Sequence, residues 1–116
     1  MNRKKENNME QKNRFSKLVQ SKHEQLDLYT NAITKAHGES HPEAFKVRRL
    51  YEELHEEILE AKEAFDEKRL SSIFASLKAV TNNFMIPEDV CETYASVYKE
   101  LALLANEFDE YVKEEI

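Results

Sequence analysis

The sequence predicts an all-α fold, an up-down four-helix bundle with a shortened third helix. Its 116 residues include only one glycine and two prolines, and 41% of them are apolar, enough for one sizeable core. Apolar residues also recur three and four positions apart over long stretches, which is the spacing of a helix face. We expect residues 1–12 to be a basic flexible tail and residues 13–116 to form a single helical bundle domain.

The first helix is predicted between Asn8 and Ala36. Its apolar positions at helical spacing are Phe15, Leu18, Val19, Leu26, Tyr29, Ile33 and Ala36. Gly38 then indicates a turn. Ser40 and Glu43 have the spacing of a capping box, so we expect the second helix to begin here, with Pro42 tolerated in its first turn.

The second helix is predicted to carry the apolar seam Val47, Leu50, Leu54, Ile58, Ala61 and Phe65. The third helix begins a new seam at Leu70. Five residues of helix turn through about 500°, which leaves Leu70 roughly 140° away from the earlier stripe. We therefore expect a tight turn around Asp66–Arg69. A single bent rod is the alternative, and it would imply an intertwined dimer.

The fourth helix is predicted to open at Pro87, where a proline and two acidic residues suit a helix N-terminus. A strict three-four alternation typical of a bundle helix follows, through Val90, Tyr94, Val97, Leu101, Leu104, Phe108, Tyr111 and Glu115. We expect Cys91 to be a small buried side chain beside Val90.

Charge and composition narrow the classes of partner and location. The net charge of −6 disfavours nucleic acid and anionic membrane surfaces as partners. No apolar stretch approaches the ~20 residues needed to span a bilayer. The lone cysteine cannot form an internal disulfide, which agrees with a cytoplasmic protein.

Two stretches of the chain resemble a known family. The first is Ala36-His37-Gly38-Glu39-Ser40-His41-Pro42-Glu43, followed by Val47-Arg48 and Leu54-His55-Glu56-Glu57-Ile58. The second is Thr81-Asn82-Asn83, then Pro87-Glu88 and Cys91-Glu92-Thr93-Tyr94 with Tyr98. Both resemble parts of the hemerythrin-like domain of iron–sulfur cluster repair di-iron proteins, which implies a hemerythrin-like bundle.

The resemblance also implies where iron ligands would stand, because that family binds a di-iron pair through inward histidines and carboxylates. Transferred position by position, these ligands fall on Ala61, Phe65, Glu67, Tyr111, Glu115 and, on the first helix, near Ser16. Only Glu115 keeps the family's residue type. Losing imidazoles from three helices removes most of the iron affinity, so we expect no cofactor and an interior filled by hydrocarbon.

The remaining polar residues give no catalytic motif. His37 and His41 are separated by a glycine and do not share a helical face, so we interpret them as turn residues. We interpret His55 as a partly solvated flank residue, and no Cys/His pair has a spacing that indicates activation. The acidic run Glu52-Glu53, Glu56-Glu57 and Glu60 is expected to be an exposed helix face, or alternatively a docking surface for a basic partner.

The sequence favours a protein that is not an enzyme, but it does not decide this question. Three hypotheses of function follow. The first is a metal-free hemerythrin-like bundle that acts through protein contacts, with a protein partner or as a dimer, in stress or iron–sulfur physiology. The second is a di-iron or other metal-binding repair or nitric-oxide-response protein, with iron at an altered site of Glu67, Tyr111, Glu115 and a nearby histidine. The third is an unrelated small helical binding module of the immunity-protein type.

Overall fold

The computed structural model describes residues 3–61 and 64–114, and the side chains of residues 14–61 and 64–113. Within these residues the chain has four helices and no strand: α1 (Arg3–His37), α2 (Glu43–Glu60), α3 (Glu67–Val80) and α4 (Glu92–Glu114). The all-α prediction is confirmed, and α3 is the shortest helix, with 14 residues. None of the described helices is long and apolar enough to cross a membrane.

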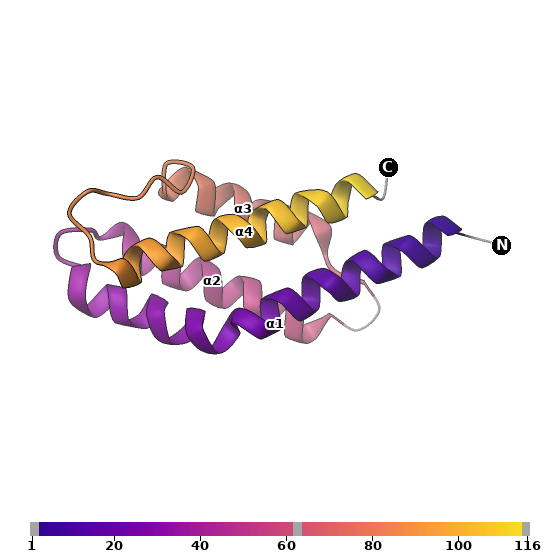
Figure 1. Cartoon of the computed structure of the whole chain (residues 1–116), viewed down its shortest axis with the longest axis horizontal. Helices are drawn as coiled ribbons and strands as arrows, with labels where there is room; N and C mark the ends of the chain where they lie inside the picture. The colour runs from indigo at the N-terminus through magenta and orange to yellow at the C-terminus, as the bar shows by residue number, and fades with distance from the viewer. Residues whose placement is uncertain (1–2, 62–63, 115–116) are drawn as a thin grey trace.

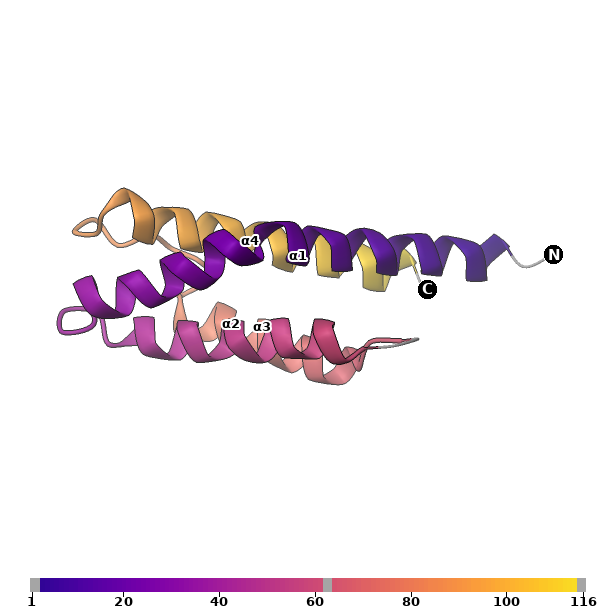
Figure 2. The same cartoon turned by 90° about the horizontal axis from the view of Figure 1, so that it is seen from below.

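The helices lie in two layers, α1 with α4 and α2 with α3 (Figure 2). Each connection reverses the direction of the chain along the long axis (Figure 1). The molecule is elongated, at 55 × 22 × 21 Å, and the first turns of α1 project past the other helices (Figure 1). Ion pairs join α1 to α4 between Arg14 and Glu107 and between Lys22 and Glu100.

The core between the layers is apolar and aromatic. Its largest fully buried side chains come from all four helices: Tyr51, Tyr94, Tyr98, Phe15, Leu26, Ile33, Leu54, Leu70, Leu77, Leu101, Leu104 and Val19. Each large apolar side chain that is removed from water contributes about 1.5–3 kcal/mol. Burial of the predicted seams is therefore the main stabilisation of the fold.

The first helix begins at Arg3, five residues before the predicted Asn8. Its backbone therefore includes most of residues 1–12. The division into a flexible tail and a bundle domain concerns motion, and it stays a prediction. The other end of α1 agrees with the sequence, since the helix ends at His37 and Gly38 follows in the turn.

Gly38 is required by a close approach between α1 and α2. A Cβ atom at this position would overlap the carbonyl oxygen of Thr34 and would lie 2.6 Å from the ring of Phe45. The predicted capping box is wrong, because no side-chain hydrogen bond caps α2. The Glu43 carboxylate instead binds His41 Nδ1 at 2.9 Å and the Tyr94 hydroxyl at 3.3 Å.

Helices α2 and α3 are separate, as the phase of their seams predicts, but the break comes earlier than Asp66–Arg69. Asp66 caps α3, and its side chain accepts the Arg69 N–H at 3.1 Å. The predicted turn residues thus form the cap and first turn of α3. Phe65 lies in the connection, not in α2, yet it remains in the core at 7% exposure.

Glu57 differs from the exposed face expected for the acidic run, because it is buried at 8% exposure. Its carboxylate accepts the Asp66 N–H at 3.2 Å and pairs with Arg69 Nη1 at 3.0 Å. These two bonds attach the start of α3 to α2. Burial of this carboxylate is compatible with stability because both oxygens have donors.

Helix α4 begins at Glu92, five residues after the predicted Pro87. The segment before it contains Asn82, Asn83 and Phe84 with positive φ, a conformation that asparagine tolerates better than phenylalanine. Asp89 binds His41 in the α1–α2 turn, which holds this segment as a loop. Cys91 is consequently exposed at the start of α4, so its predicted burial is wrong.

Candidate functional site

Three of the described positions that the resemblance assigns to iron ligands belong to the apolar core or pack against it: Phe65, Tyr111 and Ala61. The Phe65 and Tyr111 rings are 5.8 Å apart at 76°, and Phe15 and Phe108 pack against them. Glu67 lies half-buried in the first turn of α3, and Glu115 is outside the described residues. Among the described side chains, no group of three or more His, Cys, Asp or Glu residues could hold a metal ion.

Polar side chains instead gather in a groove between α1 and α2, about 330 Å³ in volume. Its lining residues are His23, Asp27, Tyr51, Glu52, His55, Glu56 and Leu59. We call this site the α1–α2 groove. It joins two imidazoles, a phenol, three carboxylates and an exposed leucine.

The two histidines of the groove stack face to face. Their ring centroids are 3.4 Å apart and the rings are parallel to within 1°. Burial lowers the pKa of His55, and the neighbouring His23 lowers it further. Two charged imidazoles at this distance would repel each other, which is why the neighbouring ring disfavours the charged form of His55.

Tyr51 fixes one member of the stack. Its hydroxyl is 2.7 Å from His23 Nδ1, and the Tyr51 side chain is fully buried. Burial raises the pKa of Tyr51 well above its usual range, which keeps the hydroxyl protonated. The neutral phenol can therefore share a hydrogen bond with the imidazole without adding charge to the groove.

The groove keeps an excess of negative charge. Arg48 pairs with Asp27 at 2.8 Å and with Glu52 at 3.3 Å. Its guanidinium holds the pKa of Asp27 below the usual range. One guanidinium thus offsets only part of the charge of the carboxylates in the lining, and Glu56 adds an exposed carboxylate at the rim.

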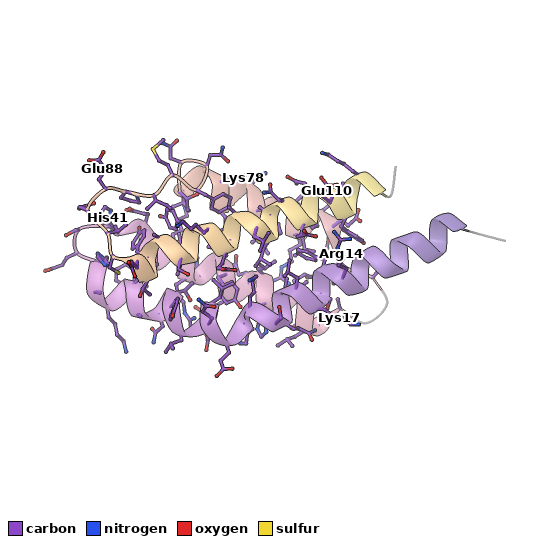
Figure 3. The ribbon with its side chains drawn as sticks, viewed as in Figure 1. Arg14, Lys17, His41, Lys78, Glu88 and Glu110 are labelled. Carbon is purple, nitrogen blue, oxygen red and sulfur yellow. The ribbon has the colours of Figure 1, made fainter. Side chains whose placement is uncertain are left out.

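A second cluster lies at the end of the bundle, where the α1–α2 turn meets the α3–α4 connection. His41 binds Glu43 Oε1 through Nδ1 and Asp89 Oδ1 through Nε2, both at 2.9 Å. Figure 3 labels His41 at this end, near the loop that carries Glu88. The hydrogen bond to Glu43 and the interaction with Asp89 raise the pKa of His41, because both nitrogens donate only in the charged form.

His37 Nε2 lies 3.2 Å from the exposed Cys91 Sγ in the same cluster. This pair could not be predicted from local spacing, because 54 positions separate the two residues. His37 also packs edge-on against Tyr94, at 5.3 Å and 81°. An imidazole beside a thiol can accept its proton, which is the first requirement for a nucleophilic cysteine.

The pairing of His23 with His55 does have a signal in the sequence, which is the spacing of the two residues about the turn. In an antiparallel helical hairpin, residues at equal sequence distance from the turn lie side by side. His23 and His55 are equidistant from Glu39 in the turn, and so are Thr30 and Arg48, which are joined at 2.9 Å. The interpretation of His55 as a partly solvated residue was correct, but its partner was not foreseen.

Comparisons of the chain with protein-family models, curated proteins and solved structures find no match. The resemblance to hemerythrin-like domains therefore stays a prediction. The geometry itself offers a polar groove between α1 and α2, a carboxylate-bound imidazole at the bundle end, and a closed aromatic core.

Proposed function

We propose that this chain is a metal-free, non-catalytic, hemerythrin-like up-down bundle that acts through protein–protein contacts in the cytoplasm, as an accessory in stress or iron–sulfur cluster physiology. One observation carries the proposal. Rings of Phe15, Phe65, Phe108 and Tyr111 pack against one another, with centroids 5.6–6.1 Å apart, around positions where the resemblance places iron ligands.

This packing argues against metal binding on energetic grounds. A di-iron pair needs several deprotonated ligands that converge within about 2.0–2.2 Å of each ion. Phe65 offers none, and the buried Tyr111 is surrounded by aromatic rings. Opening this space for ions would expose well-packed hydrocarbon and lose its dispersion contacts.

Action through protein contacts is supported by the surface. The side chains of Leu28, Phe45, Leu59 and Met85 are between 57% and 64% exposed. Single exposed apolar residues are common, but Leu59 lines the α1–α2 groove and Leu28 follows Asp27 of its lining. Apolar side chains beside a charged groove match the anatomy of protein interfaces.

Metal analysis tests the proposal directly. Freshly purified protein, and protein incubated anaerobically with ferrous iron and then desalted, should both contain iron far below one equivalent per chain. Visible absorption should show no di-iron bands. Iron at about two equivalents per chain would sink the proposal.

A matched variant identifies the site if iron is found. The alternative function places iron at Glu67, Tyr111 and Glu115, so the double variant Glu67→Gln and Tyr111→Phe would then lose it. The variant His23→Gln and His55→Gln serves as the control, because the α1–α2 groove is a separate site.

A further inference from the structure

Charge is distributed unevenly along this chain. Residues 1–22 contain only two acidic residues, Glu6 and Glu10, and their basic residues are Arg3, Lys4, Lys5, Lys12, Arg14, Lys17 and Lys22. The rest of the chain is strongly acidic, because the whole chain still has a net charge of −6. Arg14 already pairs with Glu107 of α4, so we call residues 3–12 the basic arm.

The acidic counterpart is the α1–α2 groove and the face of α2 beside it. Glu52, Glu56 and Glu60 are exposed and recur every four residues, so they line one side of the helix. Glu52 and Glu56 also line the groove. Burial lowers the pKa of His55 in the groove, which disfavours a positive charge on this imidazole beside the carboxylates.

The basic arm cannot reach the groove of its own chain. Both lie on α1, which is one continuous helix from Arg3 to His37. Lys5 and Asp27 are 22 positions apart, or about 33 Å along a helix. Figures 1 and 2 show the first turns of α1 projecting away from the α1–α2 turn. A second copy of the chain can bring an arm to the groove.

We propose that the basic arm of one copy docks against the α1–α2 groove of a second copy. This inference rests on the proposed function, because it names a second copy of the chain as the partner in the proposed protein–protein contacts. An antiparallel arrangement of the two α1 helices places each arm beside the other copy's groove. This arrangement closes with two-fold symmetry, forming two identical contacts and no open-ended chain.

Docking would also stabilise the helical structure of the basic arm. A projecting helical segment of about ten residues is only marginally stable in water. Contact with the carboxylates of Glu52 and Glu56 would stabilise it, and the exposed Leu59 offers apolar surface in the groove. The contact is mainly electrostatic, so it should weaken with salt.

Sedimentation equilibrium on the full chain gives the first test. We expect dimers in the micromolar range at about 0.01 M salt, where the Debye length is roughly 30 Å, and dissociation toward monomers at about 1 M salt, where it is roughly 3 Å. A protein that stays monomeric in low salt would overturn the inference. So would a dimer whose dissociation constant is the same at both salt concentrations.

Charge exchange gives the second test. The groove variant Glu52→Lys and Glu56→Lys should raise the dimer dissociation constant at least about tenfold, and the arm variant Lys4→Glu and Lys5→Glu should do the same. Combining all four substitutions restores opposite charges across the contact and should recover dimerisation. Failure of the combined variant to recover, with its helical content intact by circular dichroism, contradicts the proposed contact.

The matched control is Glu88→Lys with Glu110→Lys. It changes the net charge by the same amount as the groove variant, but Glu88 lies on the α3–α4 connection and Glu110 on α4 (Figure 3). We expect it to keep the wild-type dissociation constant. Equal weakening by the control would show a general effect of net charge and overturn the assignment to the groove.

The two proposals fail in different ways. A metal-free protein that stays monomeric overturns the arm-to-groove contact and leaves the proposed function in place. Iron bound at about two equivalents overturns the proposed function whatever the association state.

Discussion

At the scale of single residues, the histidines show how the fold changes the chemistry of one residue type. Burial and a neighbouring imidazole lower the pKa of His55. Hydrogen bonds to two carboxylates raise the pKa of His41. The two residues therefore give stability opposite dependences on pH, and titration of individual imidazoles is needed to separate them.

We predict that His41 links stability to pH at the bundle end. Its pKa in the folded protein lies above 6.5, the ordinary value for histidine, so its contribution is fully present below about pH 6.5 and is lost as pH rises through the raised pKa. His41→Gln should remove this dependence. The measurement is the free energy of unfolding in urea across this range, with the pKa of His41 followed by NMR. A wild-type His41 that titrates below 6.5 contradicts the prediction.

Sequence reasoning at this scale succeeded for side chains that serve the core. Val47, Leu54 and Leu101 are fully buried, as their spacing predicts. It failed for Cys91 and Glu57, since the surroundings of each depend on contacts with another segment: Asp89 with His41 before the start of α4, and Arg69 with the Glu57 carboxylate. Periodicity reports the face of one helix and carries no information on which other segment covers it.

At the scale of elements, helix interiors were predicted better than helix ends. The seams of α2 and α4 follow from apolar spacing alone. Their limits depend on contacts between segments: Asp89 with His41 delays the start of α4, and Glu57 with the Asp66 N–H fixes the start of α3. An end set by such contacts is not visible in the local sequence.

The cap of α3 provides a test at this scale. Asp66→Ala removes the acceptor of the Arg69 N–H and should lower the free energy of unfolding by about 1 kcal/mol. Ser71→Ala is the matched control, because Ser71 is exposed within the same helix and should change stability little. Urea unfolding of both variants measures the difference. Equal effects of the two substitutions would mean that the cap does not stabilise α3.

At the scale of the whole molecule, stability should depend mainly on the aromatic cluster between the layers. Phe108 is 3% exposed and packs against Phe15 at 5.6 Å and Phe74 at 5.2 Å. Phe108→Ala should lower the free energy of unfolding by about 3–5 kcal/mol, through lost burial and the cavity left behind.

Leu103→Ala is the control on the same helix, since Leu103 is 40% exposed. Leu103→Ala should lower the free energy of unfolding much less than Phe108→Ala. Urea unfolding measures both values, and the comparison is valid if the free energy depends on urea concentration with the same slope in both variants. A small loss for Phe108→Ala would mean that the aromatic cluster tolerates a void, which is incompatible with a closely packed interior.

The architecture was largely predictable at this scale, and the candidate site was only partly so. Four helices follow from periodicity and from the positions of Gly38, Pro42 and Pro87. The α1–α2 groove needed the register of the hairpin, which places His23 over His55. Ligand positions transferred by resemblance did not point to it, because Ala61, Phe65 and Tyr111 lie with the core instead.

The close approach at Gly38 gives the hairpin a pivot. His23 is 15 positions from it, or about 22 Å along α1, so a tilt of only about 5° between α1 and α2 would shift the helices by about 2 Å at that point. A methyl group at Gly38 would therefore push α1 and α2 apart and separate the stacked rings of His23 and His55. We therefore expect Gly38→Ala to widen the α1–α2 groove.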